Sequence, residues 1–349
     1  MSSTCPPFVH PDYWQLLGSK PPAPPPPVTD LHVLRETTDA TTKAVFDAMP
    51  IADGMDITTR TATSADGTEF EITRFVPLSV QQQQQKDPDT PQRAIVFAFG
   101  GGLVAGNVPI WRNAIADFAE RAGTQVFAPD YRLAPENPYP AGMQDVHASI
   151  VWLQAHAREF HVDPARIVTF GVSAGGNLVA SAALKARDEG LTPPVAAQVL
   201  RYPMLDDRTR IDDKNPHLPY LTWRPSANER AWDAYLKQVN AKEGDTGKMA
   251  DDCAPQALTN GVFEADTIPY TAVPARAKDL RGLPTTLIGV SDLDLFCEES
   301  MNFAERLEQQ GVQARAIVYR GVPHGFDMVP TFSSRQELWN DEISFIQRF

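Results

Sequence analysis

The chain has 349 residues, of which 42% are hydrophobic, so it is long enough to bury the core of one large α/β domain. Its formal net charge of −13 argues against nucleic acid or an anionic membrane surface as a partner. No apolar run reaches transmembrane length, no cluster has metal-ligand spacing, and three widely spaced cysteines without a charged-then-apolar leader predict a reduced, cytoplasmic protein.

The N-terminal third contains a proline-rich stretch, an expected helix and two expected strands. Residues 21–27 predict a stiff polyproline spacer, with a ligand for a proline-reading module as the alternative. A short helix is expected over residues 41–49, where apolar side chains share one face. Between strands expected at 70–76 and 94–98, the glutamine-rich run 81–85 is of low complexity, and we interpret it as a mobile hairpin tip.

Three consecutive glycines, residues 100–102, follow the second of these strands and expose backbone N–H groups. In an acyl-transfer enzyme such a loop supplies an oxyanion hole, here from Gly101 and Gly102 together with the N–H of Ala174. A dinucleotide-binding fingerprint is the alternative, because residues 100–105 fit G-x-G-x-x-A and Asp130 ends the next strand. Residues 107–109 interrupt the helix that a pyrophosphate site needs, which disfavours that alternative.

The pentapeptide at 171–175, Gly-Val-Ser-Ala-Gly, lies between a buried strand expected at 166–170 and a small-residue helix at 175–184. This context predicts a nucleophile elbow with Ser173 at its tip. Glycines are needed there because the turn is strained and brings strand and helix close together. A small-residue turn that only packs against the sheet is the alternative.

A long insertion at 205–271 follows the strand expected at 197–202 and mixes prolines with charged and aromatic residues. It is too long for a simple connection. Trp223 and Trp232 suggest an amphipathic lid helix that contributes to the substrate pocket. The alternative is that these aromatic side chains only attach the lid to the core.

A histidine and two aspartates follow the last two expected strands. Asp292 and Asp294 end the strand at 285–290, and His324 follows the strand at 314–319. The order serine, acid, histidine is the one that α/β-hydrolases use. All of these residues come just past the carboxyl ends of strands, where doubly wound sheets place their sites.

Taken together, these motifs resemble the hormone-sensitive-lipase family of α/β-hydrolases, also called the bacterial family IV esterases, from about residue 70 onward. Residues 99–102 stand where the family has H-G-G-G, 130–136 match D-Y-R-L-A-P-E, and 171–176 stand where it has G-D-S-A-G-G. Residues 275–284, 293–296 and 321–327 resemble the fungal branch. The resemblance puts the catalytic aspartate at Asp294, with Asp292 as the fallback. The chain departs from the family at Phe99 and Val172, which replace a histidine and an aspartate.

The family resemblance implies an α/β-hydrolase fold, a mostly parallel, doubly wound sheet with helices on both faces and a helical cap. We expect an N-terminal arm with the first cap segment (1–50), two core parts (51–204 and 272–349), and a cap insertion (205–271) between them.

The expected reaction is hydrolysis of a small or medium apolar carboxylic ester through an acyl-enzyme, without a cofactor. Ser173 would attack, His324 would accept its proton, and Asp294 would orient the imidazole. Family analogy makes a secondary-metabolite ester a plausible substrate. Acyl transfer or cyclisation stays open, as does ligand binding without turnover of the kind seen in gibberellin receptors of this fold. A homodimer also stays open.

Overall fold

The structure, a computed structural model, describes residues 5–23, 27–240 and 268–349. The centre of the proline-rich stretch, most of the second half of the cap insertion, and Cys253 lie outside the described residues.

One eight-stranded sheet forms the centre of the described structure, in the order β1-β2-β4-β3-β5-β6-β7-β8. β1 and β2 pair antiparallel, β2 pairs antiparallel with β4, and all remaining neighbours are parallel. The expected mostly parallel sheet is therefore confirmed. The strands are β1 (Asp56–Thr63), β2 (Glu69–Val76), β3 (Gln92–Ala98), β4 (Gln125–Pro129), β5 (Val162–Val172), β6 (Ala197–Arg201), β7 (Thr285–Leu293) and β8 (Ala314–Pro323).

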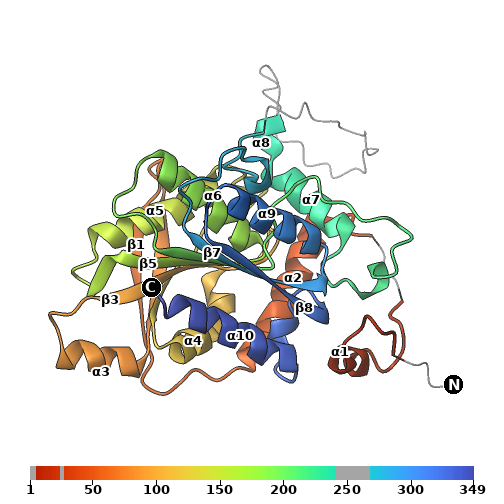
Figure 1. Ribbon diagram of the computed structural model, residues 1–349, viewed down its shortest axis with the longest axis horizontal. Coiled ribbons are helices and arrows are strands. Elements are labelled where there is room, and N and C mark those ends of the chain that lie inside the picture. Colours follow the sequence, from red (N-terminus) through yellow and green to blue (C-terminus); the bar gives the residue numbers. More distant parts are fainter. Residues whose placement is uncertain (1–4, 24–26, 241–267) are drawn as a thin grey trace.

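Helices cover both faces of this sheet (Figure 1). α5 (Ala141–Ala155), α6 (Ala174–Asp188) and α9 (Cys297–Gln309) lie on one face, and α4 (Val108–Ala122) and α10 (Ser333–Ile346) on the other. Near the carboxyl ends of the strands, α2 (Leu31–Asp47) packs against α4 and α7 (Pro225–Tyr235). The remaining α-helices are α1 (Pro11–Leu16), α3 (Leu78–Lys86) and α8 (Lys237–Asn240).

The central strands are buried on both sides, because helices cover both faces. All residues of β4 and β6 are buried, as are Ile167–Val172 of β5. This explains why these segments read as near-continuous apolar runs rather than as alternating patterns. Because β3, β5, β7 and β8 run parallel, the segments that follow them gather at one edge of the sheet.

The expectation of a hairpin tip at residues 81–85 is wrong. The glutamine run lies within α3, and β2 and β3 are not neighbours in the sheet. Glutamine is a good helix former, and Val80 buries its side chain while Gln81 Nε2 donates to the carbonyls of Gly54 and Val76. These contacts hold the segment as a helix.

Two further expectations differ in extent. The helix expected at 41–49 begins ten residues earlier, at Leu31, where the side chain of Asp30 accepts hydrogen bonds from the backbone N–H groups of His32 and Val33. In the cap, Trp223 precedes α7 rather than lying within it, because Pro225 occupies the first turn of that helix.

Candidate active site

Ser173 lies on a strained turn between β5 and α6. Its backbone has φ +54° and ψ −116°, and residues that carry a side chain rarely adopt such a positive φ. A Cβ at Gly171 would lie 2.3 Å from the carbonyl oxygen of Gly175, and one at Gly175 would lie 2.1 Å from that of Ala98. Glycine is therefore required at both positions, as the elbow interpretation predicts.

The structure brings the predicted serine, histidine and aspartate into one hydrogen-bonded chain. The distance from His324 Nε2 to Ser173 Oγ is 3.0 Å, and from His324 Nδ1 to Asp294 Oδ2 it is 2.7 Å. The side chain of Asp294 is fully buried, and its Oδ1 accepts a hydrogen bond from the N–H of Phe296. The carboxylate is thus held in a fixed orientation against the imidazole.

Asp292, the fallback acid, lies elsewhere. Its Oδ1 accepts a hydrogen bond of 2.5 Å from the backbone N–H of Gly321, and its Oδ2 lies 3.8 Å from Arg320. It therefore ties the end of β7 to the end of β8, whereas Asp294 reaches the histidine.

Three residues that the sequence analysis missed contact His324, two at its imidazole ring and one at its backbone carbonyl. The ring of Tyr202 lies 4.4 Å from it between centroids, and the ring of Phe296 meets it edge-on at 5.3 Å. Thr222 Oγ1 donates a 2.6 Å hydrogen bond to the carbonyl of His324. The residues come from separate parts of the chain, so only the fold shows that they meet.

Tyr202 is itself held by a buried charged network behind the histidine. Its hydroxyl donates to Asp327 Oδ1 at 2.5 Å, and Arg201 binds both Asp327 and Glu342. Burial, reinforced by the charge of Asp327, raises the pKa of Tyr202 well above its ordinary value, so the phenol stays protonated and remains a donor. The network fixes the ring that packs against His324.

Cys297 lies close to the aspartate but does not offer a second nucleophile. Burial, together with the charges of Asp294 and Asp292, raises the pKa of its thiol to about 11. The thiol is therefore protonated near neutral pH, and a protonated thiol is a poor nucleophile.

The glycine loop after β3 lies against the serine. A Cβ at Gly100 would lie 3.3 Å from Ser173 Cβ. Within the described part of the chain, no hydrogen bond involves the N–H groups of Gly101, Gly102 or Ala174. These three donors are thus available to a ligand. The following helix, α4, begins at Val108 and not at the glycines, which removes the basis for a dinucleotide site.

The two departures from the family pattern are both buried. The ring of Phe99 stacks on Tyr131, with a centroid distance of 4.0 Å and an angle of 13°, and the Tyr131 hydroxyl donates to the carbonyl of Phe99 at 2.7 Å. Val172 is 1% exposed at the end of β5. An aromatic stack therefore anchors the start of the glycine loop where the family has histidine.

The two tryptophans expected to bind substrate occupy different places. Trp223 covers the glycine loop, because a Cβ at Gly102 would lie 2.4 Å from its Cη2 atom. Trp232 is buried against Tyr235 within α7, and among the described residues no hydrogen bond or ring contact joins it to Ser173 or His324.

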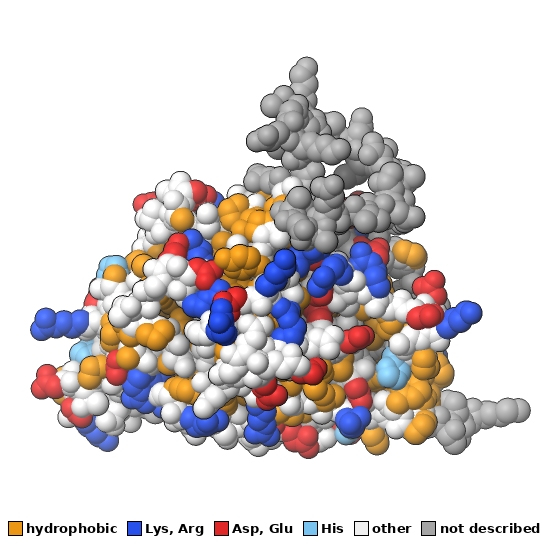
Figure 2. Space-filling view, turned by 45° about the horizontal axis from the view of Figure 1, so that its top comes forward, with side chains coloured by type: hydrophobic (Ala, Val, Ile, Leu, Met, Phe, Trp, Pro, Cys, Tyr) orange, Lys and Arg blue, Asp and Glu red, His pale blue; other side chains and the backbone are white. Residues whose placement is uncertain are grey.

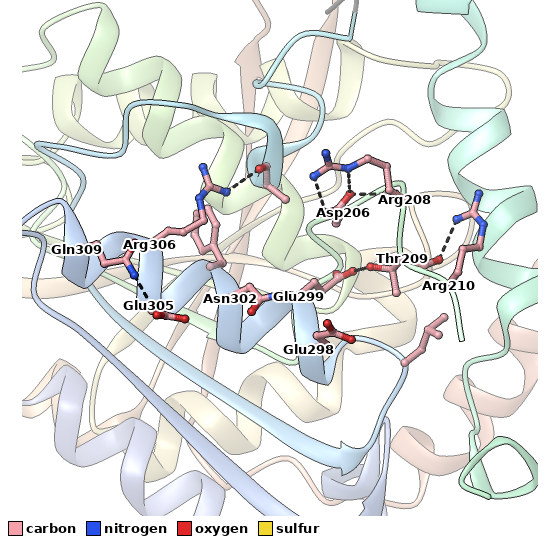
Figure 3. Close-up of a pocket in the computed structure, with 13 residues that line it drawn as sticks. Asp206, Arg208, Thr209, Arg210, Glu298, Glu299, Asn302, Glu305, Arg306 and Gln309 are labelled. Atoms are coloured by element: carbon pink, nitrogen blue, oxygen red, sulfur yellow. Dashed lines mark hydrogen bonds and ion pairs between the residues drawn. The ribbon is translucent and has the colours of Figure 1, made fainter. Parts of the chain in front are cut away.

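A polar cavity of about 580 Å³ lies between residues 206–210, Ala275 and α9 (Figure 3). Several of its charged side chains already have partners: Asp206 binds Arg208, Glu299 accepts from the hydroxyl of Thr209, and Arg306 donates to the carbonyls of Ala275 and Ala277. Ser173 does not line this cavity. It is therefore distinct from the expected acyl pocket.

The charged surface, the length of the helices and the grouping of possible metal ligands are relevant to the partners expected from the sequence. Lysine and arginine side chains are interspersed with aspartate and glutamate on the face shown in Figure 2. In the described ranges, no helix is both long and apolar enough to cross a bilayer. The same ranges contain no group of three or more His, Cys, Asp or Glu side chains that could hold a metal ion.

Several known proteins with similar sequences or structures are esterases by name. Esterase LipI of Mycobacterium tuberculosis is 30% identical over 240 residues, which cover 68% of this chain and 67% of the relative. Carboxylesterase NlhH of the same species is 28% identical over 324 residues, covering 86% and 92%. The solved structure of a bacterial heroin esterase superimposes with a TM-score of 0.78 at 29% identity and covers 98% of both chains.

The family model described as the α/β hydrolase fold matches residues 95–328, which include the glycine loop, the elbow serine, the aspartate and the histidine. The match spans well over half of the chain. The chain therefore belongs to the α/β-hydrolase family, in the esterase group that resembles hormone-sensitive lipase.

Proposed function

We propose that this protein is a serine carboxylesterase that hydrolyses small to medium apolar carboxylic esters. The observation that carries the proposal is the chain of hydrogen bonds from Ser173 through His324 to Asp294 on a strained elbow. Relatives named as an esterase and a carboxylesterase support the same activity.

In the first half of the reaction, Ser173 Oγ attacks the ester carbonyl while His324 Nε2 takes the hydroxyl proton. The buried carboxylate of Asp294 holds the Nδ1–H tautomer and stabilises the imidazolium that forms. Negative charge then develops on the carbonyl oxygen, which the N–H groups of Gly101, Gly102 and Ala174 stabilise. His324 returns the proton to the departing alcohol, and an acyl-enzyme remains.

In the second half, water attacks the acyl-enzyme with His324 as the base, and Ser173 is released with the carboxylic acid. The protein needs no cofactor for these steps. Trp223, which lies over Gly102, would contact the substrate, whereas Trp232 would support the cap from within. The division of the chain at residues 50, 204 and 271 remains part of this proposal.

Two alternatives use the same geometry. Transfer to an alcohol or amine, or cyclisation, passes through the same acyl-enzyme and differs only in the second nucleophile. Ligand binding without turnover is less well supported, because a receptor has no use for a hydrogen-bonded serine, histidine and aspartate. Four expectations stay predictions: membership of the fungal-type branch, a secondary-metabolite ester as substrate, a cytoplasmic location and a homodimer.

The test is turnover of short-chain p-nitrophenyl esters combined with intact-mass measurement after exposure to a fluorophosphonate. We expect one covalent adduct on the wild-type chain, none on Ser173→Ala, and a loss of several orders of magnitude in rate. Retention of more than a tenth of the wild-type rate by Ser173→Ala would refute the proposal. Asp294→Asn should greatly reduce turnover, while Asp292→Asn provides the matched control, because it is a neighbouring carboxylate that does not contact His324.

A further inference from the structure

We propose that Arg35 and Asp39, on the N-terminal helix α2, are positioning residues that hold the glycine loop in the geometry needed to stabilise the oxyanion. The inference rests on the proposed function, since it assigns a role toward the same reaction. Neither residue is part of the motifs that carry the family resemblance.

Both side chains bind the backbone of residues 104–106, which continue the glycine loop. Asp39 Oδ1 accepts a hydrogen bond of 2.7 Å from the N–H of Gly106, and Arg35 Nε donates a bond of 2.5 Å to the carbonyl of Val104. The two residues are four apart on α2, so they lie on the same face of the helix. One helix face therefore binds both a donor and an acceptor of the loop.

Arg35 also ties the loop to the segment that follows β4. Its Nη2 donates to the carbonyl of Ala134 at 2.7 Å, and its guanidinium forms a bidentate pair with Glu136 at 2.8 and 2.7 Å. The N–H of Ala134 in turn donates to the carbonyl of Leu103 at 3.0 Å. A planar guanidinium can make all these contacts at once, whereas an ammonium group cannot.

These contacts act on the part of the loop that shapes Gly101 and Gly102. The carbonyl of Gly101 accepts bonds from the N–H groups of Val104 and Ala105, so residues 101–105 form one tight turn. The turn is strained, since Leu103, a residue with a side chain, has φ +68°. A strained loop keeps its shape only while its surroundings hold it, and α2 supplies polar contacts to Val104 and Gly106.

The position of α2 gives these contacts a second consequence. The helix packs against α7, and the N–H of Val28 just before it donates to Ser226 Oγ at the start of α7. The helix α2 thus contacts both α7 and residues 104–106 of the loop. Displacement of α2 would break the contacts of Arg35 and Asp39 with the loop. The rate of the chemical step would therefore depend on the position of this helix.

The experiment compares variants of Asp39 and Arg35 with a control pair on the same helix. Asp39→Leu removes the acceptor for Gly106, whereas Asp39→Asn retains a carbonyl oxygen that can accept the same bond. Arg35→Met removes every polar contact of the guanidinium. Lys43→Met and Asp47→Asn break an exposed ion pair of 2.5 Å on α2 that does not reach the loop, and serve as controls.

Each variant is measured for kcat and KM on p-nitrophenyl butyrate and for inhibition by an alkyl trifluoromethyl ketone, which forms a hemiketal oxyanion with the serine. We expect Asp39→Leu and Arg35→Met to lower kcat about tenfold or more, leave KM within twofold, and weaken ketone inhibition by the same factor as kcat/KM. Asp39→Asn should stay within threefold of the wild type, and the control variants within twofold.

The inference is overturned if Asp39→Leu and Arg35→Met raise KM at unchanged kcat, or if they lower the melting temperature without changing kcat or ketone affinity in the folded protein. It is also overturned if Asp39→Asn is as damaging as Asp39→Leu. These outcomes are distinct from failure of the proposed function, in which Ser173→Ala would itself retain activity and the wild-type chain would form no adduct.

Discussion

A methyl group added at Gly102 tests whether Trp223 covers the glycine loop. Gly102 has φ +64°, and a Cβ there would lie 2.4 Å from Cη2 and 2.7 Å from Cζ2 of the tryptophan. Carbon atoms in contact normally lie about 3.5–4.0 Å apart, so the ring or the loop must move by about 1 Å. The left-handed backbone adds a strain of about 1–2 kcal/mol for any residue with a side chain.

Gly102→Ala should therefore lower both activity and stability. If the loop moves rather than the ring, the N–H of Gly102 leaves its place in the oxyanion hole. The loss of this one donor should reduce kcat by a factor of about 10² to 10³. Trp223→Ala removes the clashing ring but leaves the strain of the backbone. The double variant Gly102→Ala/Trp223→Ala should consequently recover most of the lost rate and retain a deficit of about 1–2 kcal/mol in stability.

Gly101→Ala is the matched comparison, because a Cβ at Gly101 would lie 2.0 Å from the carbonyl oxygen of Ala105. A backbone atom is the obstacle there, so Trp223→Ala should not rescue this variant. The assay is kcat/KM on p-nitrophenyl acetate, with thermal unfolding of each single and double variant as a double-mutant cycle. If Trp223→Ala rescues neither glycine variant, or both equally, the placement of its ring over Gly102 is wrong.

Two further predictions concern the buried groups around the site. Burial raises the pKa of the Glu342 carboxyl from 4.5 to about 7. Its contribution to the free energy of unfolding is therefore full below about pH 4.5 and is lost as the pH rises through 7. In urea unfolding between pH 5 and pH 8, the wild type should lose up to about 3 kcal/mol in this way, and Glu342→Gln should flatten the fall. An unchanged slope would contradict that assignment. Phe99→His loses the stack on Tyr131 and should destabilise by about 2–4 kcal/mol. Val172→Asp in the same chain should restore part of the loss, and strict additivity in the cycle would show that the two sites are independent.

The residues at the carboxyl ends of the strands could be predicted from the sequence because local rules determine them. A serine between glycines at 171 and 175, with a strand before it and a helix after it, predicts a strand-to-helix turn, and a histidine after a strand reaches the same edge of a parallel sheet. The choice between Asp292 and Asp294 depended on family resemblance rather than on local pattern. In the structure it follows from geometry, since Asp294 alone of the two contacts His324.

Other features depend on contacts between distant segments, which no local pattern encodes. Tyr202 meets His324 across more than one hundred residues of sequence, and Thr222 reaches the carbonyl of the same histidine from the cap. The glutamine run at 81–85 is misleading in another way. Its composition resembles a disordered tip, but Val80 and Gln81 hold it against the core as part of α3. The edge strand β1 has little apolar pattern because Ala62 is its one buried residue.

The contacts around the glycine loop explain how a chain that lacks the family histidine and aspartate can still hold that loop in place. At its start, Tyr131 stacks on Phe99 and donates to its carbonyl, and just beyond its end the carboxylate of Asp130 accepts a bond from the N–H of Val108. Arg35 and Asp39 bind the turn between these points. Each of these contacts uses a backbone group other than the N–H of Gly101 or Gly102. Polar support for the loop in this chain therefore comes from Tyr131, Asp130, Arg35 and Asp39, while the N–H groups of Gly101 and Gly102 make no hydrogen bond within the described residues.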